Sequence, residues 1–175
     1  YPLQKLRAKV GIVMQKSVLF QGTIRSNLLW GKPDATEEEM WKALRIAQAE
    51  DVVKKKKAGL DEPVEQEGRN FSGGQRQRLA IARALVRQPE ILILDDSASA
   101  LDYATDAALR KAIREELTGM TLIIVSQRAA SVRNADQIVV LEDGGMAGLG
   151  NHQELMDRCE VYREIYESQY GKGAH

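Results

Sequence analysis

The sequence has 175 residues, a length that suits one domain with a sizeable hydrophobic core. It carries 25 basic and 25 acidic side chains, so its formal net charge is zero, which argues against a nucleic-acid binder that depends on overall charge. The single cysteine, Cys159, excludes an internal disulfide framework and a two-cysteine metal site, and no apolar run approaches the roughly 20 residues that span a bilayer.

The N-terminal half predicts a strand and a capped helix. Residues 9–13 form a short apolar run typical of a strand, which leads into a mixed segment. Thr36 and Glu39 have the spacing of a capping box, so we expect a helix from Thr36 to about Glu50. The lysine run at residues 54–57 is interpreted as a solvated helix end, with a phosphate or lipid contact as the alternative.

The C-terminal half alternates helices with apolar runs. Ser72 and Asp102 stand where helix N-caps are expected, before helices that end near Arg87 and Leu117. Three apolar runs predict strands buried on both faces: residues 91–94, 121–125 and 137–141. A last amphipathic helix follows the turn at Gly144. Strands that alternate with helices indicate an α/β fold with a largely parallel sheet.

Two aspartates, Asp95 and Asp96, directly follow the apolar run at residues 91–94. We expect them at the carboxyl edge of the sheet, which is where α/β sheets place their ligands. One carboxylate there suits Mg²⁺ held through its water shell, and the next can face a nucleophile. A strand-end helix cap or a surface pair is the alternative interpretation of the two aspartates.

The motif Ser72-Gly73-Gly74-Gln75 opens the helix that precedes this strand. Two glycines at a helix N-terminus let backbone N–H groups approach an anion, and the helix dipole favours a negative charge there. Ser72 adds a hydroxyl donor. By itself the motif is typical of a turn, but its order and tight spacing with the two aspartates make the combination specific.

In this order the motifs resemble those of exporter-type ATP-binding cassette (ABC) ATPases. Residues 71–75 resemble the signature motif of the family, and residues 91–96 resemble its Walker B strand. Residues 99–102 look like the D-loop, and Gln15 looks like the Q-loop glutamine. The resemblance implies a P-loop NTPase-like (RecA-like) parallel sheet with an α-helical signature subdomain, truncated at its N-terminus.

The resemblance runs from Gln4 to about Tyr170 and therefore covers nearly the whole sequence as a partial nucleotide-binding domain. Residues 62–68 occupy the place of the X-loop of exporters, with Gln66 where glutamate is usual. The expected helical subdomain comprises residues 24–88. The ATPase core comprises residues 1–23 and 89–150, and a C-terminal helix comprises residues 151–175.

In this family, two cassettes enclose two ATP molecules head to tail. The resemblance implies that residues 72–75 contact the ATP held by the partner cassette. Asp95 and Gln15 would coordinate the Mg²⁺ of the chain's own ATP, directly or through water. Asp102 would communicate between the two sites.

The resemblance also implies a membrane partner. The segment around Phe20 and Trp30 would line the groove that receives the coupling helices of a transmembrane domain, with ordinary core positions as the alternative for these two aromatics. The expected location is the cytoplasmic face of the plasma membrane, with no nucleic-acid partner.

Two positions depart from the pattern of the family. Asp96 stands where a catalytic glutamate is usual, and the missing methylene withdraws its carboxylate by about 1 Å. Gln127 stands where exporters carry a switch histidine, and an amide cannot shuttle a proton. We therefore expect the degenerate-site subunit of a heterodimeric bacterial multidrug-type exporter, which hydrolyses ATP poorly itself but completes the competent site of a non-identical cassette.

The phosphate loop pattern GxxxxGK[ST] does not occur in the sequence. In the family it precedes the Q-loop, so we expect it upstream of Tyr1, in a longer protein of which this is an internal piece. We also expect an interrupted sheet, with an exposed apolar seam between the strand before Gln127 and the strand at residues 137–141. By itself the chain should bind ATP weakly and show no meaningful ATPase activity.

Two other interpretations stay open. A soluble ABC ATPase acting on DNA or ribosomes would need long coiled-coil insertions or paired cassettes, and neither is visible in the sequence. A non-hydrolysing regulatory pseudo-cassette would be favoured if replacement of Ser72 had no effect.

Overall fold

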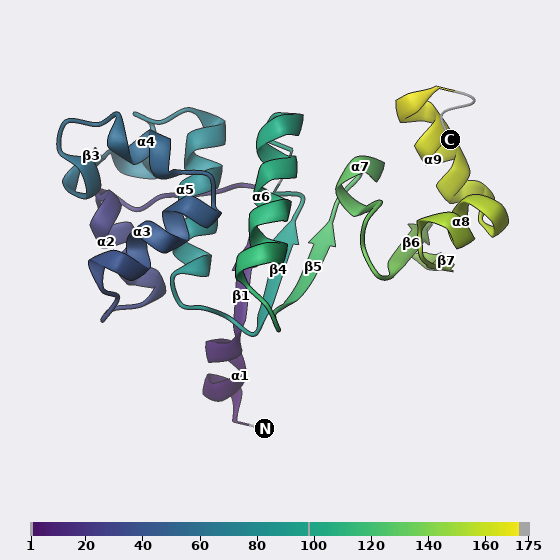
Figure 1. The fold of residues 1–175 in the computed structure, drawn as a ribbon, viewed down its shortest axis with the longest axis horizontal. Helices are drawn as coiled ribbons and strands as arrows, with labels where there is room; N and C mark the ends of the chain where they lie inside the picture. Colours follow the sequence, from purple (N-terminus) through teal and green to yellow (C-terminus); the bar gives the residue numbers. More distant parts are fainter. Residues whose placement is uncertain (1, 98, 172–175) are drawn as a thin grey trace. The chain divides into compact units, whose positions relative to one another are not determined.

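The computed structural model describes residues 2–97 and 99–171, which belong to two compact units, Tyr1–Val125 and Ser126–His175 (Figure 1). The first unit holds a parallel sheet in the order β1-β4-β5. Its strands are β1 (Val10–Val13), β4 (Ile91–Asp95) and β5 (Thr121–Val125). Both neighbouring pairs are parallel and in continuous register, so the predicted α/β fold with a parallel sheet is confirmed.

The helices of the first unit gather mainly beside this sheet. They are α1 (Leu3–Lys9), α2 (Ile24–Gly31), α3 (Glu37–Ile46), α4 (Glu50–Lys54), α5 (Gly73–Leu85) and α6 (Tyr103–Glu116). A small antiparallel pair, β2 (Gly22–Thr23) with β3 (Pro63–Val64), and two 3₁₀ turns, η1 (Gly59–Asp61) and η2 (Gln66–Gly68), complete it. Helix α5 packs against both α2 and α3 and also against β1, so it joins the helical cluster to the sheet (Figure 1). One apolar core joins residues of β1, β4, α2, α3, α4, α5 and α6, with Leu44, Ile81 and Leu92 fully buried.

Side-chain caps begin the helices where the sequence predicts them. Thr36 Oγ1 accepts from the Glu39 N–H at 3.2 Å, and the Glu39 carboxylate accepts from the Thr36 N–H at 2.9 Å. Ser72 and Gln75 form the same reciprocal cap on α5, whereas the Asp102 carboxylate caps α6 by accepting from the Thr105 N–H. Each cap satisfies a backbone donor that the first helical turn leaves without a partner.

The helix predicted from Thr36 to about Glu50 is shorter than expected. It ends at Ile46, because Gln48 takes a left-handed conformation with φ 57° and reverses the chain. The Ala49 N–H then donates to the carbonyl of Leu44 at 2.8 Å, which closes the helix end, and α4 begins separately.

The second unit contains a hairpin and three short helices. Its elements are α7 (Ala129–Val132), β6 (Ile138–Glu142), β7 (Gly145–Gly150), α8 (His152–Arg158) and α9 (Glu160–Tyr170). Asp143 and Gly144 have positive φ and form the tight turn of the β6–β7 hairpin. The prediction of a single last helix is wrong, because Cys159 has an extended backbone and separates α8 from α9.

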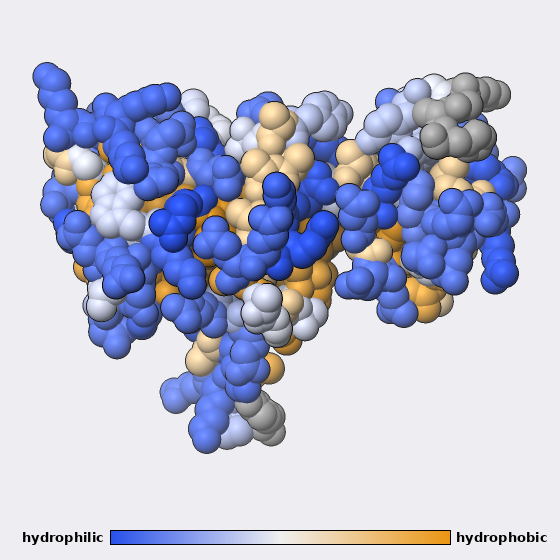
Figure 2. Space-filling view, in the orientation of Figure 1, coloured by the Kyte–Doolittle hydropathy of each residue, from blue (hydrophilic) through white to orange (hydrophobic). Residues whose placement is uncertain are grey.

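Strand β6 pairs antiparallel with β7 in a two-stranded sheet of the second unit, and the predicted gap between β5 and β6 stays a prediction. Strand β5 is an edge of the three-stranded sheet, and Ile123 and Val125 on it are 45% and 51% exposed. In the hairpin, Val139 and Leu141 are 55% and 69% exposed, and Figure 2 shows apolar surface on both units. Apolar side chains on an open strand edge favour association with a further segment. None of the described helices is both long and apolar enough to cross a bilayer.

Candidate functional site

The carboxyl edge of the sheet brings two of the predicted site residues together. Gln15 lies just beyond β1, Asp96 follows β4, and the two strands run parallel side by side. Gln15 Nε2 donates to Asp96 Oδ2 at 3.0 Å, which leaves the amide oxygen of Gln15 available as a ligand. Asp95, the last residue of β4, is half-buried, and no hydrogen bond or ion pair holds its carboxylate among the residues that the structure describes.

This arrangement fits a hard cation for which the protein supplies only one or two ligands. Within residues 2–97 and 99–171, no group of three or more His, Cys, Asp or Glu side chains could hold a metal by itself. Mg²⁺ in nucleotide sites takes only one or two protein ligands, and phosphate oxygens and waters supply the others. The carboxylate of Asp95 and the amide oxygen of Gln15 are suitable for such an ion.

The backbone of Asp96 is held from both sides. Its N–H donates to the carbonyl of Val125 on β5 at 2.8 Å. Its own carbonyl accepts from the N–H of Ser99 at 3.2 Å and from Ser99 Oγ at 2.8 Å. Asp96 also has φ 43°, in the left-handed region that aspartate tolerates better than most residues. These hydrogen bonds fix the direction of the Asp96 backbone at the end of β4.

The signature motif opens α5 with a reciprocal cap. Ser72 Oγ accepts from the Gln75 N–H at 3.3 Å, and Gln75 Oε1 accepts from the Ser72 N–H at 3.0 Å. The N–H groups of Gly73 and Gly74, in the first turn, have no intrahelical acceptor. Because Gly73 is exposed, an anion can approach these donors at the positive end of a helix of 13 residues.

The signature motif also lies against the segment that looks like a D-loop. A Cβ atom on Gly74 would lie 3.2 Å from the carbonyl oxygen of Ala100, so this close approach favours glycine. Two residues on, the Asp102 carboxylate accepts from the N–H and the hydroxyl of Thr105 at 2.8 and 2.7 Å. Two hydrogen bonds from Thr105 lower the pKa of Asp102 below its ordinary value. The bond from the backbone N–H has the larger effect, and the bond from the hydroxyl has the second largest.

One polar contact inside the first unit is missing from the sequence predictions. Gln77 on α5 is 1% exposed, and its Oε1 accepts a short hydrogen bond from Ser17 Oγ. Its Nε2 is buried without a hydrogen-bond partner in the described part of the chain. Gln77 has helical spacing with the buried Ile81 and Leu85, so its place on the apolar face of α5 was readable from the sequence.

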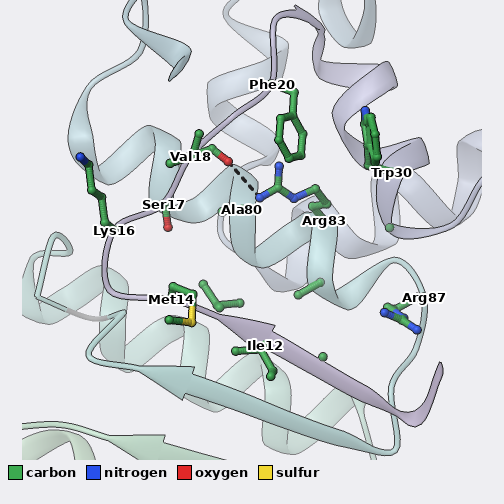
Figure 3. Close-up of a pocket in the computed structure, with 14 residues that line it drawn as sticks. Ile12, Met14, Lys16, Ser17, Val18, Phe20, Trp30, Ala80, Arg83 and Arg87 are labelled. Atoms are coloured by element: carbon green, nitrogen blue, oxygen red, sulfur yellow. Dashed lines mark hydrogen bonds between the residues drawn. The ribbon is translucent and has the colours of Figure 1, made fainter. Parts of the chain in front are cut away.

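A cavity of about 440 Å³ lies between β1, the segment after it and α5 (Figure 3). Phe20 and Trp30 stand on one side of it with ring centroids 5.0 Å apart. They are 45% and 70% exposed, which excludes the ordinary core positions that were their alternative. The Arg83 guanidinium lies 5.0 Å from the ring of Phe20, and burial lowers the pKa of Arg83.

Comparison with known proteins decides the family. The profile described as "ABC transporter" matches residues 1–99, which is more than half of the chain. The chain belongs to the ABC transporter family. ABC transporter proteins of Bacillus subtilis are similar to it over nearly its whole length. YfiB, named an uncharacterized ABC transporter ATP-binding protein, is 44% identical over 98% of this chain and 30% of its own length.

A second relative and a solved structure agree with this assignment. YheI of Bacillus subtilis, named a probable multidrug resistance ABC transporter ATP-binding/permease protein, is 46% identical over 96% of this chain. The structure of a bacterial Atm1-family ABC exporter with ATP bound superposes with a TM-score of 0.91 at 37% identity, over 95% of this chain. The chain spans 29% of the length of each, so it corresponds to less than a third of these ABC transporter proteins.

Gln127, the second departure from the pattern of the ABC family, lies in the second unit. The backbone carbonyl of Gln127 accepts a hydrogen bond from Gln169 Nε2 at 2.6 Å, and Gln127 is exposed. This contact fixes the start of α7 against α9, since the Ala129 N–H donates to Oε1 of the same Gln169 at 2.9 Å. The role of Gln127 in hydrolysis stays a prediction from the sequence.

Proposed function

We propose that the chain is the ATP-binding part of an ABC exporter and acts with a second, non-identical cassette. The observation that carries the proposal is the presence of two separate half-sites on one unit. The carboxyl edge of the sheet offers Gln15, Asp95 and Asp96, and the N-terminus of α5 offers backbone donors and Ser72. Relatives named ATP-binding/permease proteins support an exporter over a soluble ATPase of DNA or ribosomes.

The two half-sites have different tasks in this proposal. Asp95 and Gln15 would hold Mg²⁺ at the chain's own ATP, and the bound ATP supplies the phosphoryl group that water attacks. The signature residues 72–75 would donate to the phosphates of ATP held by the partner cassette. Asp102, whose capping carboxylate begins α6 close to the signature turn, would transmit the state of one site to the other.

We infer that the chain's own site binds ATP but hydrolyses it slowly. The Asp96 carboxylate is shorter than the glutamate usual in the family and is already engaged by Gln15. Misplacement of a catalytic group by about 1 Å can cost about 10²-fold in rate. With Gln127 in place of a histidine, the site also lacks a group that can shuttle a proton.

The membrane portion of the exporter would dock on the cavity beside Phe20 and Trp30. Exposed aromatic side chains beside a hollow are typical of surfaces that bury an apolar partner. Docking there would put the chain at the cytoplasmic face of the plasma membrane, and ATP binding and hydrolysis across the two cassettes would drive export of a substrate.

The proposal is tested in the transporter assembled with its membrane portion and both cassettes. Gly73→Asp puts a negative charge where the phosphates of the partner's ATP would lie, so we expect a loss of ATPase activity of about 10²-fold or more. Gly145→Asp adds the same charge at an exposed hairpin position and serves as the matched control. Unchanged ATPase activity in Gly73→Asp would refute the assignment of the signature to the partner's site.

A further inference from the structure

The cavity beside Phe20 and Trp30 is lined by cations and apolar side chains, without an acidic residue. Its charged lining residues are Lys16, Arg83 and Arg87. None of these three forms an ion pair with any residue that the structure describes. The hollow is therefore positively charged, and nothing in the described part of the chain neutralises it.

Arg83 is the most constrained of the three cations. Its guanidinium donates to the carbonyl of Val18 at 2.9 Å (Figure 3) and to Oδ1 of Asn27 at 3.4 Å, and both acceptors are neutral. A guanidinium carries five N–H donors, so donor capacity remains. Burial already lowers the pKa of Arg83, which means that its charge is partly removed from water without an opposite charge to compensate.

Arg87 continues the same charged wall. It follows the end of α5 four residues after Arg83, and within the described residues its Nη2 donates to a neutral acceptor, the carbonyl of Arg7, at 2.9 Å. Figure 3 shows both arginines on the same side of the hollow as α5, with Trp30 beside Arg83. A carboxylate between apolar side chains suits such arginines, through charge-assisted hydrogen bonds.

From this geometry we infer that the cavity selects a short helix carrying an Asp or Glu between apolar side chains. The carboxylate pairs with Arg83 and Arg87, and the apolar neighbours pack on the exposed rings of Phe20 and Trp30. This inference rests on the proposed docking of the membrane portion and adds the chemistry by which one of its cytosolic helices is recognised. Charge complementarity of this kind gives specificity for the correct partner.

The test uses double-mutant cycles in the assembled transporter. Each Asp and Glu in the cytosolic loops of the membrane portion is changed singly to Asn or Gln, with and without Arg83→Met, and substrate-stimulated ATPase activity is measured. We expect one loop carboxylate whose loss lowers stimulation about tenfold, with no further loss when Arg83→Met is present. Arg114→Met, on the exposed face of α6, is the matched control and should act additively.

A charge swap provides a second variant that does not disturb Arg83. Arg87→Glu should lower stimulation, and changing the identified loop carboxylate to Arg in the same protein should restore it. Additive effects for every loop carboxylate with both arginine variants would overturn the inference.

Cross-linking separates this inference from the proposed function. Val18→Cys lies in the lining of the cavity and should form a disulfide with a cysteine placed in the docked loop. Cross-links without any coupled carboxylate would leave membrane docking standing and reject the acidic helix. A cross-link only to a second copy of the chain would reject both.

Discussion

Gln15 donates from Nε2 to Oδ2 of Asp96 at 3.0 Å and so joins the residues that follow two neighbouring strands. The contact engages one carboxylate oxygen of Asp96 with an amide rather than with water. A longer carboxylate would extend past this hydrogen bond toward the position of an attacking water. The same contact keeps Gln15 close to Asp95 at the edge of the sheet, where Mg²⁺ would bind.

The first prediction concerns Asp96 and Gln127, the two positions that depart from the pattern of the family. Asp96→Glu combined with Gln127→His should raise ATP turnover at the chain's own site by about 10- to 100-fold, because a carboxylate base and a proton-carrying side chain are restored. Turnover is measured in the assembled transporter with the partner's site silenced. Asp96→Asn with Gln127→His is the control, since a neutral amide accepts no proton. No gain from the first pair would reject the local explanation of slow hydrolysis.

The second prediction concerns the packing of α2 on α5. A methyl group on Gly31 would overlap the carbonyl oxygen of Arg83 and come within 2.8 Å of Val86 Cγ1. Gly31→Ala should therefore lower the free energy of unfolding by about 1–3 kcal/mol. Gly145→Ala, where the nearest atom is 3.5 Å away, should change it little. Equal unfolding midpoints for the two variants in denaturant titrations would contradict the close approach.

The third prediction concerns the buried contact between Ser17 and Gln77. Ser17→Ala leaves both ends of the Gln77 amide without a partner, which should cost about 1–3 kcal/mol of stability. Adding Gln77→Leu removes the unsatisfied amide, so the double variant should be more stable than Ser17→Ala. Urea titrations of the parent, Ser17→Ala, Gln77→Leu and the double variant measure this, and additive losses would show that the amide finds another partner.

The fourth prediction concerns His152, whose Nδ1 lies 2.9 Å from the hydroxyl of Tyr162. Burial, and then the nearby Arg133, lower the pKa of His152. Neutral His152 therefore contributes to the free energy of unfolding. This contribution is complete above the pKa of about 6.5 that histidine has in the unfolded chain, and it is lost as the pH falls through the lower pKa of the folded state. We expect weaker protection of α9 amides from hydrogen exchange at mildly acidic pH. His152→Gln should remove this pH dependence, and its persistence in the variant would assign the effect to another group.

The sequence predicts the parts of this fold that depend on local chemistry. Caps at Thr36, Ser72 and Asp102 act within a single turn, so their residue types are enough to place three helix starts. The break at Gln48 could not be predicted, because it depends on how Ala47 and Ala49, both fully buried, pack against the core. Cys159 separates the last two helices for the same kind of reason, since its side chain is buried in the second unit.

For the candidate site, the pattern of residues indicates which elements meet but not how they are linked. Parallel strands explain why Gln15 and Asp96 lie at one edge. The hydrogen bond of Ser17 to Gln77 spans 60 residues of sequence and depends on the packing of α5 beside the segment after β1. The positive lining around Arg83 likewise exists only once these elements are assembled.

The left-handed backbone of Asp96 has a consequence for how this position can change over generations. At φ 43°, aspartate is among the few side chains accepted with little strain, whereas a glutamate carries a larger backbone penalty at the same angle. The backbone hydrogen bonds of Asp96 to Val125 and Ser99 hold this angle, so a glutamate here would act against them. A single substitution to glutamate at this position therefore begins with a backbone cost that aspartate does not carry.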